Sequence, residues 1–259
     1  MKLVILAGGL GTRISEETSI RPKPMVEIGG MPIIWHIMKI YSYYGVKEFI
    51  ICCGYRGEMI KEFFLSYTTK YNDFTINIKS KNKIKIHKKL IEDWKITLVD
   101  TGQNTMTGGR LNLIKKFLKK NETFCLTYGD GLSDINIKNL ISYHNKHKKA
   151  ATMTIVLPPG RFGMVTYDKN LNINSFLEKP SGDGSWVNGG FFVLNRSTLD
   201  LVSKNEDIWE EVPLKLLAKQ GNLKAYKHKG FWKAMDTLKD KMILEDMWKN
   251  NPTWKVWKS

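Results

Sequence analysis

The sequence is poor in acidic residues and cysteines, and it has no long apolar run. It contains 25 Asp and Glu against 41 Lys and Arg, which gives a formal net charge of +16. Its three cysteines (Cys52, Cys53 and Cys125) lie in apolar runs without metal-site spacing, so we expect buried free thiols in a reducing cytoplasm. The apolar start ends after Leu6, too early for a signal peptide or a membrane span. We therefore expect a cytoplasmic protein with no membrane partner.

The positive charge raises the hypothesis of a nucleic-acid binder. The lysines are scattered, however, and often lie beside Asn and Ile, as between Lys79 and Ile86. No nucleic-acid-binding module is recognisable, and the aromatic residues do not alternate with lysines to form a stacking platform. We expect no nucleic-acid partner and interpret the charge as a general basic field that also helps to attract anionic substrates.

The order of the predicted elements favours one α/β domain over residues 1–259. Strand and helix patterns alternate in the first half, which is typical of a Rossmann-like, mostly parallel sheet with helices on both faces. Small β-rich insertions complete the predicted fold. The pattern predicts strands over 3–6, 49–53, 98–102, 123–128, 151–156 and 190–194, and helices over 32–44, 59–64, 137–147, 209–219 and 237–249.

Two segments lie outside this alternation. We expect residues 74–100 to be an insertion over the functional site, and residues 237–259 to be a helical tail. Trp248, Trp254 and Trp257 in that tail are too apolar to stay in water, so they pack either on this chain or, as we favour, on a neighbouring subunit. We find no internal repeat and no low-complexity linker.

A glycine-rich segment directly follows the first strand, Leu3 to Leu6, without a polar spacer. Glycines allow a tight turn with bare N–H groups that a phosphate can approach. Arg13 adds a planar charged fork, and Lys23 follows between two prolines. The segment lacks the GxxxxGK[ST] pattern of a P-loop, and Ile14 stands where a dinucleotide fingerprint needs its third glycine. The sequence therefore predicts a different kind of polyphosphate site.

The arrangement G-G-x-G-T-R followed by P-K-P resembles the sugar-1-phosphate nucleotidyltransferases. Longer runs, in order over nearly the whole chain, are similar to the glucose-1-phosphate cytidylyltransferases within that family. These runs are RPKPMVEIGGMPIIWHIM (21–38), CCGYRGEMIKEFF (52–64), VDTGQNTMTGGRL (99–111), TYGDG (127–131), PPGRFG (158–163), EKP (178–180), NGGFFV (188–193) and FWKAMDT (231–237).

The resemblance implies the nucleotide-diphospho-sugar transferase type of fold and a defined reaction. CTP and α-D-glucose 1-phosphate would give CDP-glucose and pyrophosphate by direct in-line attack, with Mg²⁺ as cofactor. It further implies a homo-oligomer, and a product used for bacterial surface polysaccharides such as the O-antigen of lipopolysaccharide. The chemistry fits the residues, because such a transfer needs cations, backbone donors and metal carboxylates and no strong base.

Two aspartates are the candidate metal ligands. Asp130 directly follows a buried strand between two glycines, although Gly-Asp-Gly also makes a good turn. Asp236 precedes a predicted helix and is equally well explained as a helix N-cap. The resemblance favours metal binding for both, since the matching aspartates of the family hold Mg²⁺ with the nucleotide phosphates. Two carboxylates with phosphate oxygens and waters suit this ion.

The resemblance also assigns roles to other residues. Arg13, Lys23 and Asp130 are the expected catalytic residues, and the backbone at Leu6, Ala7 and Gly8 is expected to read the base edge. The expected nucleotide-binding residues are Leu6, Ala7, Gly8, Gly9, Leu10, Gly11, Thr12, Arg13, Lys23, Thr105, Gly109, Arg110 and Gly129. The expected sugar-phosphate-binding residues are Gly163, Glu178, Lys179, Asn188 and Gly189, with Lys179 on the phosphate and Glu178 on the sugar hydroxyls.

Three alternatives remain open at this point. The first is the same reaction with UTP or dTTP, because the residues alone do not distinguish cytosine from uracil or thymine. The second is a catalytically silent nucleotide-binding regulator, against which the presence of Arg13, Lys23, Asp130 and Asp236 argues. The third is the nucleic-acid binder.

Overall fold

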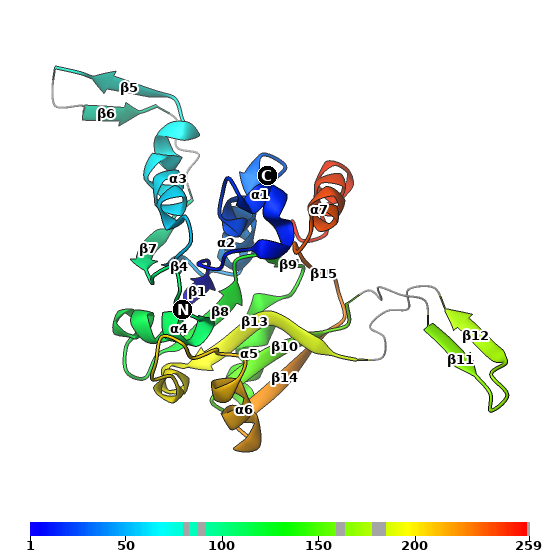
Figure 1. The fold of residues 1–259 in the computed structure, drawn as a ribbon. Helices are drawn as coiled ribbons and strands as arrows, with labels where there is room; N and C mark the ends of the chain where they lie inside the picture. The colour runs from blue at the N-terminus through cyan, green and yellow to red at the C-terminus, as the bar shows by residue number, and fades with distance from the viewer. Residues whose placement is uncertain (80–82, 88–91, 159–163, 178–184, 258–259) are drawn as a thin grey trace.

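A seven-stranded mixed sheet forms the centre of the molecule (Figure 1). The computed structural model describes residues 1–79, 83–87, 92–158, 164–177 and 185–257. The strand order is β14 (Leu223–His228), β10 (Ala151–Val156), β13 (Val187–Asn195), β8 (Thr123–Tyr128), β1 (Lys2–Leu6), β4 (Glu48–Cys53) and β7 (Lys95–Asp100). Strand β13 runs antiparallel to both neighbours, and the other neighbouring pairs are parallel. The predicted α/β fold class is confirmed.

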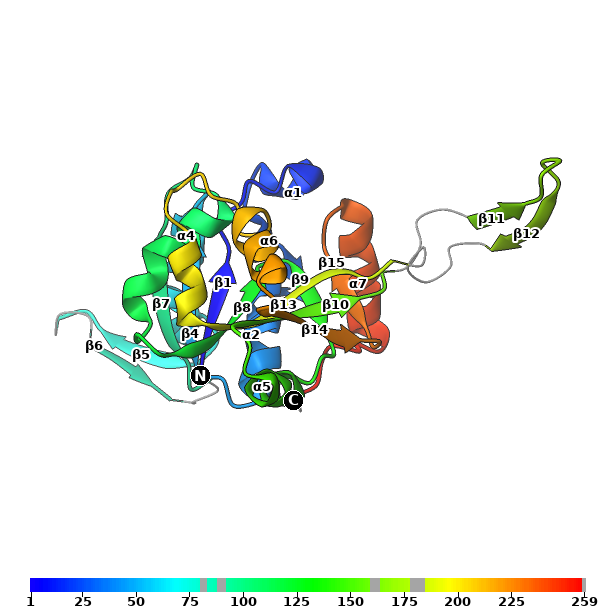
Figure 2. The ribbon, with the colours of Figure 1, turned by 90° about the horizontal axis from the view of Figure 1, so that it is seen from below.

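Helices cover both faces of the sheet (Figure 2). Alternate residues of β1 point to opposite faces, so that Leu3 and Ile5 join one buried cluster while Val4 and Leu6 join the other. Residues of α2 (Ile33–Tyr43), α3 (Gly57–Lys70), α5 (Ile137–His147) and α7 (Leu238–Asn250) complete the first cluster. Residues of α4 (Thr107–Ile114) and α6 (Val212–Lys219) complete the second. Strands buried on both faces explain the continuous apolar runs of the sequence.

Apart from the strands of two hairpins, the remaining elements are short. They are η1 (Thr12–Ile14), α1 (Ser15–Thr18), η2 (Lys23–Met25), β2 (Glu27–Ile28), β3 (Met31–Pro32), η3 (Lys115–Phe117), β9 (Gly131–Ser133), η5 (Arg196–Leu201) and β15 (Trp232–Ala234). Helix α6 begins three residues later than the pattern predicts, because Pro213 lies in its first turn and Trp209 is buried before it. The cysteines are buried free thiols, as predicted. Among the described residues, no helix has the length and apolar content to cross a bilayer.

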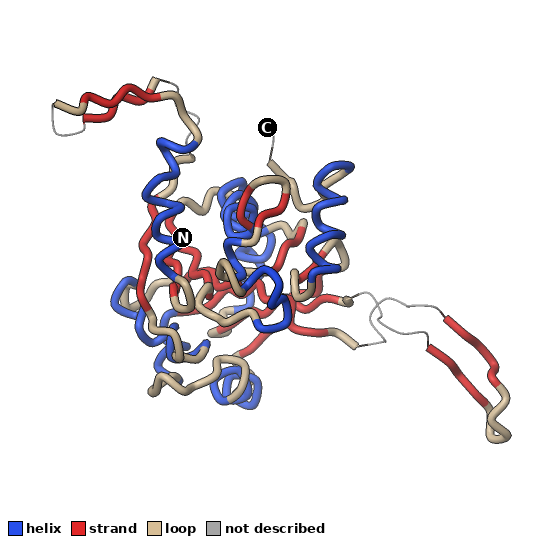
Figure 3. Tube along the Cα trace, turned by 45° about the horizontal axis from the view of Figure 1, so that its top comes forward, coloured by secondary structure: helices blue, strands red, loops and turns tan. Residues whose placement is uncertain are grey.

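Two hairpins extend from opposite sides of the body (Figures 1 and 3). They are β5 (Phe74–Asn77) with β6 (Lys83–Ile86), and β11 (Met164–Tyr167) with β12 (Ile173–Leu177). The described residues of 74–100 therefore do not form the insertion over the site that we expected. The β5–β6 hairpin points outward from the end of α3, and residues 95–100 form the edge strand β7, because their register pairs them with β4.

The C-terminal tail packs against α2 of the same chain. Trp254 is fully buried and Trp257 nearly so, and both rings lie beside His36. The His36 Nε2 atom lies 2.8 Å from the Ile28 carbonyl, and the Trp254 indole N–H donates to His36 Nδ1 at 3.4 Å. The expectation of a subunit contact was wrong for Trp254 and Trp257, since their own chain covers them, whereas Trp248 is half-buried.

We predict that acid destabilises the protein through His36. Its burial lowers its pKa to about 4 from the ordinary 6.5, because the charged form loses hydration. The neutral imidazole is therefore favoured in the folded state. The free energy of unfolding should be fully retained above pH 6.5 and should fall by about 3 kcal/mol for this group as the pH drops towards 4. Urea unfolding across this range measures the effect.

The variant His36→Gln keeps a donor for the Ile28 carbonyl but cannot titrate, so it should show a flatter pH dependence. His87→Gln, at an exposed position after β6, is the matched control and should behave like the parent protein. Identical slopes for the parent protein and His36→Gln would contradict the assignment.

Candidate active site

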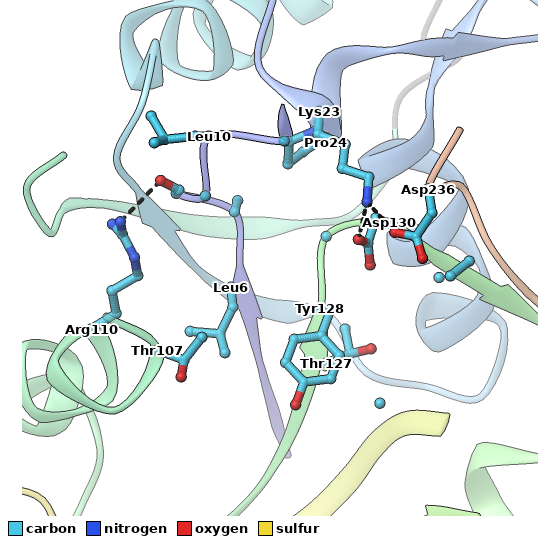
Figure 4. A pocket seen from close by; sticks show the side chains of 18 of the residues that line it. Leu6, Leu10, Lys23, Pro24, Thr107, Arg110, Thr127, Tyr128, Asp130 and Asp236 are labelled. Carbon is cyan, nitrogen blue, oxygen red and sulfur yellow. Dashed lines mark hydrogen bonds and ion pairs between the residues drawn. The ribbon is translucent and has the colours of Figure 1, made fainter. Parts of the chain in front are cut away.

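A cavity of about 790 Å³ opens at the carboxyl ends of β1, β7 and β8, which is where ligands bind in open α/β sheets (Figure 4). Every glycine-loop residue from Leu6 to Arg13 lines it. The other lining residues are Lys23, Pro24, Gln103, Asn104, Thr105, Met106, Thr107, Arg110, Thr127, Tyr128, Gly129, Asp130, Gly131, Asn188, Gly189, Gly190, Glu210, Trp232, Ala234 and Asp236. No described residue of 74–100 lines the cavity.

Asp130 and Asp236 meet in this cavity because β9 pairs with β15. Gly131 lies opposite Ala234 in that pair, and the Met235 N–H donates to the Asp130 carbonyl at 2.9 Å. Thr237 is the N-cap of α7 and forms a capping box with Asp240. Asp236 is therefore not the helix cap, and its carboxylate is left for the site.

Lys23 lies between the two aspartates. Its ammonium is 2.6 Å from Asp130 Oδ2 and 2.8 Å from Asp236 Oδ1. Burial alone would lower the pKa of Lys23, but the carboxylates outweigh it and raise the pKa above its ordinary value. Arg13 forms a bidentate pair with Asp236, with both nitrogen–oxygen distances at 2.9 Å, while 68% of its side chain is exposed. The two aspartates therefore pair with two cations, one buried and one largely exposed.

The glycine loop presents backbone donors to the cavity. Gly11 has a φ of 66°, and a Cβ there would lie 2.7 Å from Thr18 Cγ2, so glycine is required on both counts. Within the described residues, the N–H groups of Gly9, Leu10 and Gly11 donate to no protein acceptor. Such donors beside Arg13 and Lys23 suit an anionic group.

Arg110 braces this loop from behind. It is buried, and its guanidinium donates to the carbonyls of Gly8 at 2.9 Å and Gly102 at 2.8 Å, and to the Thr101 hydroxyl at 2.5 Å. It thereby joins the ends of β1 and β7. A Cβ on Gly8 would lie 2.1 Å from the guanidinium, so only glycine fits against it. Arg110 lines the cavity, but its two terminal guanidinium nitrogens already donate to backbone carbonyls and to the Thr101 hydroxyl.

The other expected nucleotide residues divide into two groups. Thr105 and Gly129 line the cavity. Gly109 does not, and its N–H donates to the Asp207 carbonyl at 3.2 Å. A Cβ on Gly109 would lie 2.4 Å from the Asn205 carbonyl oxygen. Close packing of α4 against residues 205–207 therefore explains this glycine.

Of the residues expected to bind the sugar phosphate, Asn188 and Gly189 line the cavity. The Asn188 amide donates to the Tyr128 hydroxyl at 3.2 Å, and the Gly189 carbonyl accepts from the Trp232 indole at 2.7 Å. Gly163, Glu178 and Lys179 lie outside the described residues.

Sequence reasoning missed Glu210, Tyr128 and Thr107. Glu210 accepts a short hydrogen bond from the Tyr128 hydroxyl and another at 2.6 Å from the Thr107 hydroxyl. Residues 205–211 form no recognisable motif. Only the packing of this loop on α4 shows that the Glu210 carboxylate belongs to the cavity.

The carboxylates of Asp130 and Asp236 suit a hard cation whose other ligands are phosphate and water oxygens. Asp130 and Asp236 already share one ammonium, so a single cation can contact both. No group of three or more His, Cys, Asp and Glu side chains in the described part of the chain is arranged as a metal site. Two carboxylates completed by phosphates and waters are the usual surroundings of Mg²⁺.

Comparison with known proteins identifies the family. The model of the Nucleotidyl transferase family matches residues 2–246. The chain belongs to this family. It is 54% identical over 258 residues to the glucose-1-phosphate cytidylyltransferase of Salmonella typhi, covering 99% of this chain and 100% of that protein. A Bacillus subtilis protein named "probable glucose-1-phosphate cytidylyltransferase" is 48% identical over 259 residues, again with 99% and 100% covered.

A solved structure supports the fold. UDP-glucose pyrophosphorylase from Acinetobacter baumanii has a TM-score of 0.71 at 18% identity, over 98% of this chain and 95% of that chain. This likeness concerns the fold alone. The family, the fold class and the enzyme class predicted from the sequence are thus confirmed.

We predict that Arg110→Lys weakens both the fold and nucleotide binding. A lysine cannot reach the ends of both β1 and β7, so buried carbonyls lose their donors. The free energy of unfolding should fall by about 1–3 kcal/mol, and the KM for the nucleotide should rise. Urea unfolding and steady-state kinetics measure these effects. Arg196→Lys, at the far end of β13, is the control; no change in Arg110→Lys relative to it would remove the bracing role.

Proposed function

We propose that this cavity binds CTP and α-D-glucose 1-phosphate and that the enzyme transfers the cytidylyl group to the sugar phosphate. A phosphate oxygen of glucose 1-phosphate attacks the α-phosphorus of CTP. The bond from that phosphorus to the oxygen of the β-phosphate breaks, and pyrophosphate leaves with the electron pair. The convergence of Arg13, Lys23, Asp130 and Asp236 beside free loop amides is the observation that supports this course.

In this course the chain's own groups bind and orient two anions. The amides of Gly9 to Gly11 hold the triphosphate. Lys23 leaves the aspartates and donates to nucleotide phosphate oxygens. Arg13, exposed at the cavity mouth, stabilises the negative charge that develops on the leaving pyrophosphate. The nucleophile is already ionised, so no base is needed. Asp130 and Asp236 would hold Mg²⁺, which supplies charge neutralisation to the phosphates.

The sugar phosphate takes the opposite side of the cavity. Asn188 and Gly189 line that side, and residues 178–180 precede β13, where the family resemblance assigns Lys179 to the phosphate and Glu178 to the hydroxyls. The named activity of the full-length relatives is cytidylyl transfer to glucose 1-phosphate, which favours CTP over UTP or dTTP. Arg13, Lys23 and both aspartates are present, so a silent regulator receives no support.

Three further assignments follow the family resemblance. We propose a cytoplasmic homo-oligomer whose CDP-glucose feeds bacterial surface polysaccharides. One face of the β5–β6 hairpin supports self-association: Phe74, Ile76 and Ile84 are exposed on it, and the hairpin extends outward from the end of α3 (Figure 1).

A matrix of triphosphates and sugar 1-phosphates, assayed for pyrophosphate release with and without Mg²⁺, tests the function. CTP with glucose 1-phosphate should give the highest kcat/KM, and chelation of the metal should abolish turnover. Higher kcat/KM with another triphosphate, or turnover that survives chelation, would contradict the proposal.

We predict that Arg13→Ala lowers kcat by about 10²- to 10³-fold, because a cation that meets charge developing in the transition state is lost. Arg196→Ala, which removes an arginine remote from the cavity, is the control and should retain normal turnover. Near-normal kcat in Arg13→Ala would exclude it from catalysis.

A further inference from the structure

Glu210 is a carboxylate of the cavity that the mechanism above does not use. Among the described residues, it is the lining carboxylate that forms no ion pair, since Asp130 and Asp236 are paired with Lys23 and Arg13. We propose that Glu210 is a specificity-determining residue whose carboxylate accepts a hydrogen bond from an uncharged donor of the substrates. The shared chemistry of such donors is an N–H or O–H, carried by the nucleoside or by the glucosyl unit.

A chain of hydrogen bonds fixes the orientation of Glu210. The backbone N–H of Trp209 donates to the Thr107 hydroxyl oxygen at 2.9 Å. The Thr107 hydroxyl proton therefore points to Glu210 Oε2, 2.6 Å away. The Asn188 carbonyl oxygen accepts from the Gly190 N–H at 2.9 Å, which turns its amide N–H₂ towards the Tyr128 hydroxyl oxygen. The Tyr128 proton therefore goes to Glu210 Oε1.

These contacts hold the carboxylate still but do not saturate it. Each carboxylate oxygen accepts two hydrogen bonds, and each here has one protein donor. The remaining lone pairs belong to a side chain that lines the cavity. Burial and the neighbouring Glu210 both raise the pKa of Tyr128, so the tyrosine stays a neutral donor.

The charge of Glu210 decides which part of the substrates it faces. A triphosphate and a sugar phosphate are both strongly anionic, and an unpaired carboxylate repels them. The phosphates belong with Lys23 and Arg13. Figure 4 shows Lys23 beside Asp130 and Asp236 and away from Thr107. Glu210 is held by the tip of Tyr128 and by the first residue of α4, between the nucleotide side and the Asn188 side of the cavity. It therefore meets an uncharged donor.

An acceptor of this kind distinguishes substrates mainly by the functional groups that it disfavours. An exocyclic amine or a hydroxyl satisfies the carboxylate, whereas a carbonyl oxygen at the same place is repelled and leaves the carboxylate without its donor. Cytosine carries an amine where uracil and thymine carry a carbonyl. The inference rests on the proposed function, which the matrix of substrates tests separately with the parent enzyme.

The test compares Glu210→Gln with Glu211→Gln, an exposed neighbour outside the cavity. The kcat/KM is measured for CTP, UTP, 2′-deoxy-CTP and glucose 1-phosphate, and thermal unfolding confirms that the variants fold. Glu210→Gln should lose about 10- to 100-fold in kcat/KM for the substrate that carries the donor. Glu211→Gln should match the parent enzyme.

The pattern of the loss identifies the donor, and each of three patterns supports the proposal. A loss for CTP but not UTP assigns the base amine; a loss for CTP and UTP but not 2′-deoxy-CTP assigns the ribose; a rise in the KM of glucose 1-phosphate alone assigns the sugar. Changes below about threefold for every substrate would overturn it. So would a Tyr128→Phe variant that reproduces the same loss for all substrates, because Glu210 would then act only by holding the tyrosine.

Discussion

One ammonium group shared by two carboxylates organises the active site. Lys23 lies 107 residues before Asp130 and 213 before Asp236, yet its nitrogen is within 2.8 Å of both. Without this cation the two carboxylates would repel each other. The ammonium lies between them and offsets that repulsion. This arrangement suits a site that must accept a triphosphate and a divalent cation together, because incoming charges of both signs replace existing partners.

The rest of the fold serves to hold these groups at one edge of the sheet. Parallel pairing of β1 with β4 and β8 places the glycine loop next to Asp130, and the β9–β15 pair adds Asp236 from the far end of the chain. Arg110 fixes the loop from behind through backbone carbonyls. The carboxylate of Glu210 stands apart, held by neutral hydroxyls. The cavity thus has one part in which cations and carboxylates are paired and another in which the Glu210 carboxylate accepts only from neutral donors.

The local sequence pattern was sufficient to predict most of the helices and strands and the charged residues of the site. The apolar run at Leu3 followed by glycines, and the polar Asp130 after a buried strand, each have a physical meaning that does not need coordinates. Long-range pairing could not be read from the sequence: β7 has no fully buried residue, and its place at the sheet edge depends on its register with β4. Asp236 could not be told from a helix cap until Thr237 was seen to fill that role. Gly109 and Glu210 depend on the packing of a loop without any motif.

The account stands on Asp130, Asp236 and Lys23 as the centre that receives the triphosphate and its cation. A crystal structure of the enzyme with CTP and Mn²⁺, with anomalous scattering to locate the metal, tests this most directly. The account predicts a metal peak in contact with both aspartates and the phosphates, with the Lys23 ammonium turned onto a phosphate oxygen. A metal bound elsewhere, or Lys23 still bridging the two aspartates beside bound CTP, would contradict it.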